Sequence, residues 1–127
     1  MPDADQIRAT VARYAEVFTA NDLDGYLALF ADDATLEDPV GGEVHQGVEA
    51  IRAFWDMTRE MTPTIELAIT GPVRVAGNEA AFPGEARPSL GDTPMAVPVI
   101  DTVAFDDDGK ITRLRAFWDF ADLRPLD

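Results

Sequence analysis

The sequence predicts an α+β fold, in which three helices cover one face of a curved, mixed or antiparallel β-sheet. Two observations lead to this prediction. In the first half of the chain apolar residues recur with the spacing of amphipathic helices, whereas from residue 65 onward they alternate with the period of two that is typical of strands. Helices followed by a run of antiparallel strands are characteristic of α+β domains, and we expect an apolar pocket between the two layers.

Three helices are expected before residue 62. Asp3 and Gln6 form a capping-box pattern, which predicts where the first helix begins. Asp22 is expected to cap a short second helix, and a third helix is predicted over about 48–61. Their apolar sides comprise Ile7, Val11, Tyr14, Ala15 and Phe18 in the first, Leu23, Tyr26, Leu27 and Phe30 in the second, and Ile51, Phe54, Trp55 and Met61 in the third.

The strands are expected mainly in the second half of the chain. The segment 35–47 is rich in glycine and proline, so only brief strands and turns are expected there. Pro83 indicates that its strand lies at an edge or contains a bulge. The strands are predicted at 65–69, 73–76, 79–86, 94–105 and 111–120.

Length and charge exclude several classes of protein. The 127 residues predict one domain spanning 1–127, and 24 acidic against 10 basic residues give a formal net charge of −14. Such a charge repels phosphate backbones and anionic lipid surfaces, so neither a nucleic acid nor a membrane is an expected partner. There is no cysteine, no apolar run long enough to span a membrane and no signal-peptide pattern at the start, so we expect a cytoplasmic protein.

Composition also limits the chemistry. The chain has one serine (Ser89), one histidine (His45) and one lysine (Lys110). Ser89 lies in a segment that reads as a loop, not on the sharp strand-to-helix turn that a nucleophilic serine needs, and His45 fits a loop residue better than a catalyst. No group of residues has the spacing of a metal site, so no metal is expected. The remaining catalytic groups are carboxylates and tyrosines.

Asp101 is the most informative residue, because it lies among apolar residues on one face of a predicted strand. Val99, Asp101 and Val103 point to the same side by the two-residue period of a strand. The alternative is an ordinary ion pair with Arg113 or Arg115 on the next strand.

The expected register of the hairpin argues against that ion pair. Asp108-Gly109 is a strong two-residue turn signal that pairs Asp107 with Lys110 and, counting back, Asp101 with Ala116. Both arginines then point to the opposite face. A buried carboxyl group without a cation has a raised pKa, and in its protonated form it donates a hydrogen bond.

Asp38 and Tyr14 give weaker signals of the same kind. Asp38 shares a face with Leu36 and Val40, and Pro39 favours an extended backbone at Asp38. An Asp-Pro turn with a solvated side chain is the alternative. Tyr14 lies on the apolar side of the first helix, where a purely structural tyrosine is the alternative.

The chain resembles a known family, the bacterial steroid Δ5-isomerases (ketosteroid isomerases). The resemblance extends over nearly the whole chain in order. It rests on the runs VARY, NDLDGYLALFADDATLEDPVG, GVEAIRAFW, VRVAGNEAAF, VIDTVAFDDDGKI and RAFW. It implies the cone-shaped fold of the nuclear-transport-factor-like and polyketide-cyclase-like proteins. It also implies a homodimer that forms through the outer face of the sheet, where Pro98, Ile100 and Phe117 are expected.

The resemblance also implies a role for individual residues. Asp38 matches the family's general base, Tyr14 its oxyanion-hole tyrosine and Asp101 its protonated aspartic acid, for which this family is the standard example. The implied reaction isomerises an apolar 3-ketosteroid without a metal or cofactor. The expected walls of the substrate pocket are Phe30, Phe54, Trp55, Phe82, Leu114 and Trp118.

Two features depart from the family's pattern. Trp55 stands where well-known members have a tyrosine whose hydroxyl supports Tyr14, and an indole only donates hydrogen bonds. Gly84 and Ala86 stand where bulkier residues are common, which changes the shape of the pocket. Two alternatives stay open: an enzyme of the same fold with other chemistry, such as a polyketide cyclase or an epoxide hydrolase, and a non-catalytic binding module.

Overall fold

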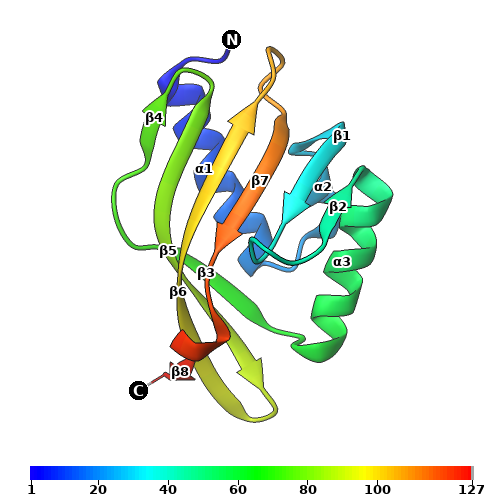
Figure 1. Ribbon diagram of the computed structural model, residues 1–127, viewed down its shortest axis with the longest axis vertical. Helices are drawn as coiled ribbons and strands as arrows, with labels where there is room; N and C mark the ends of the chain where they lie inside the picture. The colour runs from blue at the N-terminus through cyan, green and yellow to red at the C-terminus, as the bar shows by residue number, and fades with distance from the viewer. Residues whose placement is uncertain (127) are drawn as a thin grey trace.

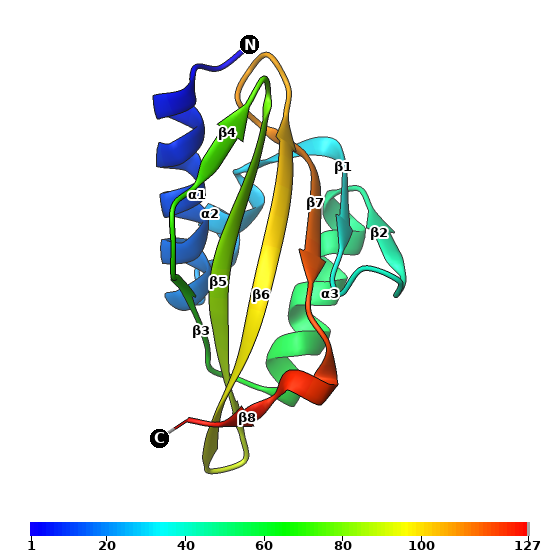
Figure 2. The same cartoon turned by 60° about the vertical axis from the view of Figure 1, so that its left-hand side comes forward.

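The computed structural model describes residues 1–126, in which three α-helices lie on the inner side of a curved, unclosed sheet (Figures 1 and 2). This arrangement confirms the predicted fold class. The elements are α1 (Ala4–Thr19), α2 (Leu23–Leu27), β1 (Phe30–Glu37), β2 (Val44–Gln46), α3 (Val48–Met61), β3 (Ile65–Ile69), β4 (Arg74–Ala76), β5 (Glu79–Leu90), β6 (Thr93–Phe105), β7 (Ile111–Phe117), the 3-10 helix η1 (Phe120–Asp122) and β8 (Arg124–Pro125).

The sheet is mixed, with the order β2-β1-β7-β6-β5-β3. The β1–β7 pair is parallel and the other pairs are antiparallel. β4 pairs with β5, and β8 pairs with β6. In both views the long β5–β6 hairpin extends past α3, so the helices cover only part of the inner face (Figures 1 and 2).

The helix starts follow the predicted caps. The Asp3 carboxylate accepts a hydrogen bond from the Gln6 backbone N–H at 2.8 Å, and the Gln6 side chain accepts one from the Asp3 N–H. Asp22 accepts from the Gly25 N–H at 2.9 Å. The prediction that Phe30 continues the second helix is wrong, because Phe30 begins β1 and pairs with Ile111. Pairing with β7 overrides the local helical pattern, and β1 is consequently a full eight-residue strand.

β5 runs beyond its predicted end at residue 86, because it changes partners along its length. It pairs with β4 through 79–81 and with β3 through 84–88, while its register with β6 is continuous across both parts. Pro83 lies at the break between the two partners. Its carbonyl there accepts from the Thr70 N–H at 3.0 Å, but proline has no N–H to return a bond to Thr70, and the pairing of β5 with β3 ends at this point.

The β6–β7 hairpin has the predicted register but a different turn. Asp101 faces Ala116, as expected. The predicted Asp107–Lys110 pair is wrong: the Asp106 N–H donates to the Lys110 carbonyl at 2.9 Å, which leaves a three-residue turn. The Asp106 side chain organises this turn by accepting from the backbone N–H groups of Asp108 and Lys110. An irregularity next to Ala104 then offsets the extra residue and restores the register.

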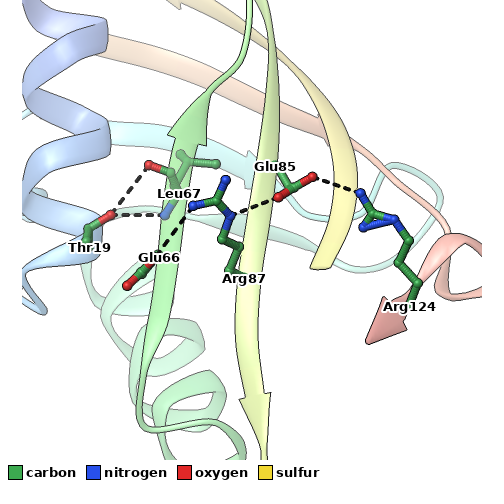
Figure 3. Close-up of polar contacts among 6 residues, drawn as sticks. All are labelled: Thr19, Glu66, Leu67, Glu85, Arg87 and Arg124. Carbon is green, nitrogen blue, oxygen red and sulfur yellow. Dashed lines mark hydrogen bonds and ion pairs between the residues drawn. The ribbon is translucent and has the colours of Figure 1, made fainter. Parts of the chain in front are cut away.

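A chain of ion pairs crosses the sheet and holds the C-terminal segment against it (Figure 3). Arg87 on β5 lies between Glu66 on β3 and Glu85, at 3.8 and 2.8 Å, and Glu85 also pairs with Arg124 on β8 at 3.0 Å. Exposed ion pairs contribute little each. These ion pairs matter because they hold the segment that contains η1, and Phe120 of η1 lines the cavity described below.

Candidate active site

A cavity of about 370 Å³ lies between the helices and the inner face of the sheet. Its walls are mainly apolar. The side chains in its lining that can ionise or carry charge are Tyr14, Tyr26, Asp38, Arg59 and Asp101. Few polar groups in an apolar cavity are typical of a site that binds an apolar ligand and orients it at a few atoms.

The structure brings together six of the nine predicted site residues. The lining includes Tyr14, Asp38, Asp101, Phe54, Trp55 and Trp118. Phe30, Phe82 and Leu114 were also expected as walls of the pocket, but they are not among the residues that line this cavity and belong to the buried hydrophobic core. Phe82 faces Asp101 across the β5–β6 pair, but its side chain is fully buried among the residues of the core.

Asp101 is buried without a cation. The residue is 3% exposed, and its Oδ1 atom has no hydrogen-bond partner within the described residues. Arg113 and Arg115 point to the other face of the sheet, where they pair with Glu79 and Glu37. Burial, with a smaller contribution from the Asp38 charge, raises the pKa of Asp101 from 3.8 to about 8. Asp101 is therefore protonated at neutral pH.

This pKa has a measurable consequence for stability. Between pH 4 and 8 the folded protein keeps a proton on Asp101 that the unfolded chain releases, so the free energy of unfolding is expected to fall as the pH rises through this window. The stabilisation of the folded state by this proton is fully present below about pH 4 and is lost above about pH 8. Urea unfolding of the wild type and of Asp101→Asn across this range isolates the effect, because the other carboxyl groups are common to both. Parallel pH profiles would contradict the raised pKa.

Asp38 lies just beyond the end of β1, where β7 holds the chain in place. The Val40 N–H donates to the Ala116 carbonyl at 2.9 Å, and the Asp38-Pro39 peptide bond is cis. The Trp118 indole N–H donates to Asp38 Oδ1 at 2.5 Å. Asp38 keeps part of its surface open to the cavity, although protein atoms surround most of its carboxyl group. Burial raises its pKa, while the Trp118 hydrogen bond and the nearby His45 act in the opposite direction.

Tyr14 brings a neutral donor to the same cavity. It lies on the buried side of α1 and is 5% exposed. Burial raises its pKa, and the neighbouring Tyr26, Asp101 and Asp38 raise it further, so the phenol keeps its proton. The cavity thus combines two protonated donors, Tyr14 and Asp101, with one carboxyl group, Asp38, that is open to a ligand. This set can move a proton and stabilise negative charge on a ligand oxygen.

Tyr26 and Arg59 also line the cavity, and sequence reasoning did not single out either as a functional group. Tyr26 was predicted only as part of the apolar side of the second helix, as a buried tyrosine normally is. Arg59 had one available signal: it follows Trp55 by four residues, which places the two side chains next to each other on a helix.

The described part of the chain contains no group of three His, Cys, Asp or Glu side chains that could hold a metal ion. Within residues 1–126, no helix combines the length and apolar composition needed to cross a lipid bilayer.

A curved sheet around helices, with carboxyl and phenol groups inside an apolar cavity, defines the class of small cone-shaped α+β proteins. Residues 11–114 match the family model described as a SnoaL-like domain, and the chain belongs to this family. It is 38% identical over 113 residues to a steroid Delta-isomerase of Nocardioides simplex, an alignment that covers 89% of each protein. Because it is this similar to an enzyme over most of its length, we conclude that the protein is an enzyme.

Other relatives have different names. The chain is 24% identical over 148 aligned positions to the epoxide hydrolase LasB of Streptomyces lasalocidi. This alignment covers 99% of this chain but only 52% of LasB. Two solved structures share the fold. The epoxide hydrolase/cyclase-like enzyme SalBIII, described with a role in pyran ring formation in the polyether salinomycin, matches with a TM-score of 0.89 and 25% identity over 99% of this chain and 100% of the other. The Δ5-3-ketosteroid isomerase from Mycobacterium sp. matches with a TM-score of 0.84 and 23% identity over 95% and 98%.

Proposed function

We propose that this enzyme is a steroid Δ5-isomerase, which converts Δ5-3-ketosteroids into conjugated Δ4-3-ketosteroids. The observation that carries the proposal is the buried, cation-free Asp101 in the same apolar cavity as Tyr14 and Asp38. A protonated carboxyl group is an uncommon donor, and it suits an oxygen that becomes negative during the reaction. The relationship to the steroid Delta-isomerase of Nocardioides simplex supports the same reaction.

The proposed mechanism is a proton transfer within the substrate. The carbonyl at C3 acidifies the C4–H bond, and Asp38 takes this proton as general base. The electron pair moves into a dienolate with its negative charge on the C3 oxygen. Tyr14 and Asp101 donate hydrogen bonds to that oxygen, and these bonds strengthen as charge develops. Asp38 then returns the proton to C6, so the enzyme regains its initial state.

Trp118 has a supporting part in this mechanism. Its indole N–H donates to Asp38 Oδ1, which holds the carboxylate in one orientation and leaves Oδ2 for the substrate proton. The apolar walls that surround these groups, among them Phe54 and Trp55, suit a steroid skeleton.

We also propose that the enzyme is a homodimer that forms through the outer face of the sheet. Pro98 is exposed on this face, and Ile100 and Phe117 face each other across the β6–β7 pair with exposures of 53% and 41%. Contiguous apolar side chains on an open sheet face are typical of a protein interface. Sedimentation equilibrium measures the mass in solution, and a monomer at micromolar concentration would contradict the proposal.

The second candidate is the opening of an epoxide, supported by the match to SalBIII along the whole chain and by the similarity to LasB. In that chemistry Asp38 would activate a hydroxyl nucleophile, while Tyr14 and Asp101 would donate to the epoxide oxygen. The isomerase proposal has the stronger support, because the sequence identity to the steroid Delta-isomerase is higher.

The deciding experiment mixes the protein with a Δ5-3-ketosteroid and follows the absorbance of the conjugated enone. The same preparation is incubated with an apolar epoxide that carries an internal hydroxyl group, and products are separated by chromatography. Rapid enone formation without consumption of the epoxide supports the isomerase. Consumption of the epoxide without enone formation would replace it with the second candidate. Steroid binding without either reaction would indicate a binding module.

A further inference from the structure

Arg59 is the one cation among the described residues that line the cavity, and the proposed mechanism leaves it unused. It lies one turn after Trp55 on α3, and its guanidinium carbon is 4.2 Å from the centre of the Trp55 ring and 4.7 Å from that of Phe18. Nη2 donates to the Phe18 carbonyl at 2.7 Å. Nη1 is buried and has no hydrogen-bond partner in the described chain. A buried, unpaired N–H group beside a reaction cavity calls for an explanation.

The neighbours of Arg59 connect it to Tyr14. Tyr26 on α2 lies with its ring centre 4.5 Å from that of Trp55 and 5.6 Å from that of Tyr14. Phe18 contacts the same group from α1. We call these four rings, of Tyr14, Phe18, Tyr26 and Trp55, the aromatic cluster. Arg59 lies against the cluster through cation–π contacts, which are strongest where water is excluded.

The charge of Arg59 acts on the phenols of this cluster. It has no carboxylate partner within ion-pair distance among the described residues, and Asp38 and Asp101 on the sheet are the acidic groups that line the same cavity. Burial lowers the pKa of Arg59, and the two phenols act in the opposite direction. Burial raises the pKa of Tyr26, whereas the Arg59 charge lowers it. The rings of Tyr26 and Tyr14 pack against each other, and the proximity of each phenol affects the pKa of the other.

We propose that Arg59, acting through Tyr26, is a positioning residue for Tyr14 that stabilises negative charge on the substrate oxygen. When Tyr14 donates its proton to that oxygen, the Tyr26 hydroxyl turns to donate to the Tyr14 oxygen. Partial negative charge then spreads over both phenols, beside the fixed positive charge of Arg59. This inference rests on the proposed function for the identity of the substrate oxygen. It assigns to Tyr26 and Arg59 the support that Trp55 has no hydroxyl group to give.

A purely structural role for Arg59 makes different predictions. The last turn of α1 contains no basic residue, and the Arg59 hydrogen bond to the Phe18 carbonyl places a positive charge at that helix end. If this is its whole role, replacing Arg59 lowers the melting temperature and leaves the ionisation of the phenols unchanged. If the proposal is correct, the phenols titrate at higher pH in the absence of the charge.

The chain offers a clean test, because Tyr14 and Tyr26 are its two tyrosines. Tyrosinate absorbance, or the signal of carbon-13 at the phenol carbon, therefore reports on this pair alone. We expect Arg59→Met, which keeps an apolar chain over Trp55, to move the first tyrosine ionisation to higher pH. Arg59→Lys, which keeps a charge, is expected to move it less. Arg52→Met is the matched control, because Arg52 lies on the same helix, is partly exposed and pairs with Glu49 outside the cavity.

The kinetic test uses the same variants with a Δ5-3-ketosteroid. We expect Arg59→Met and Tyr26→Phe each to lower kcat about tenfold, which is the rate equivalent of one hydrogen bond, with little change in KM. The double variant is expected to lose no more than the larger single loss, because both changes interrupt one path. Unchanged tyrosine ionisation in Arg59→Met, or an equal effect of Arg52→Met, would overturn the proposal. A wild type without isomerase activity would refute the proposed function, whereas the titration would still decide whether Arg59 acts on the phenols.

Discussion

Replacing Asp38 with asparagine is expected to lower kcat for the Δ5-3-ketosteroid by about two to four orders of magnitude, the usual contribution of a general base. An amide of nearly the same shape cannot accept the C4 proton. Its oxygen still accepts the hydrogen bond from the Trp118 indole, so the cavity keeps its form. We therefore expect the dissociation constant of a saturated 3-ketosteroid, measured by quenching of tryptophan fluorescence, to change little.

Glu37→Gln is the matched control for this prediction. Glu37 precedes Asp38 in the chain, but its side chain pairs with Arg115 on the outer face of the sheet, 3.0 Å away. Both variants remove one acidic group from neighbouring residues, and only Asp38 lines the cavity. A similar loss of kcat in the two variants, or nearly full activity in Asp38→Asn, would exclude Asp38 as the base.

The sequence was sufficient to predict that Asp101 lies on a buried, apolar face away from Arg113 and Arg115, because two independent constraints determine its neighbours. The two-residue period of a strand determines which side chains share its face, and burial of both apolar faces determines the register against β7. The predicted register between β6 and β7 is correct, although the predicted turn is wrong. A hairpin absorbs one extra residue through a local irregularity, whereas a shift of the whole strand would expose its apolar face.

The alternation of a strand indicates which residues face inward, but it does not indicate which of these line the cavity and which lie in the core. Phe82 and Leu114 were predicted to line the pocket, yet both lie in the hydrophobic core, which also contains buried residues of the three helices. The sequence likewise does not indicate the position of Arg59. Its guanidinium lies over Phe18 of α1 and Trp55 of α3, and Tyr26 of α2 packs against both rings. Helical periodicity describes one helix at a time, so it does not indicate where three helices meet.

Replacement of Asp101 distinguishes a protonated donor from an ionised acid. We expect Asp101→Leu to lower kcat by about 100- to 1,000-fold, as is typical when one oxyanion-hole donor is removed. Asp101→Asn is expected to keep most of the activity, because its amide donates a hydrogen bond from nearly the same position. If Asp101 were ionised, its charge would oppose the developing oxyanion, and both variants would be at least as fast as the wild type. Steady-state kinetics at pH 6 compares the three proteins while the wild-type carboxyl group holds its proton.

The pH dependence supplies a second, independent signature of the same proton. As the pH rises through about 8, wild-type Asp101 loses the proton that it donates, so kcat/KM, which reports on the free enzyme, is expected to fall. An amide has no proton to lose in this range, and Asp101→Asn should lack this decline. Asp101→Leu should be slow throughout and, above pH 8, more stable than the wild type, because it buries no charge. A decline near pH 8 that persists in Asp101→Asn would assign the titration to another group and would leave the donor role of Asp101 without kinetic support.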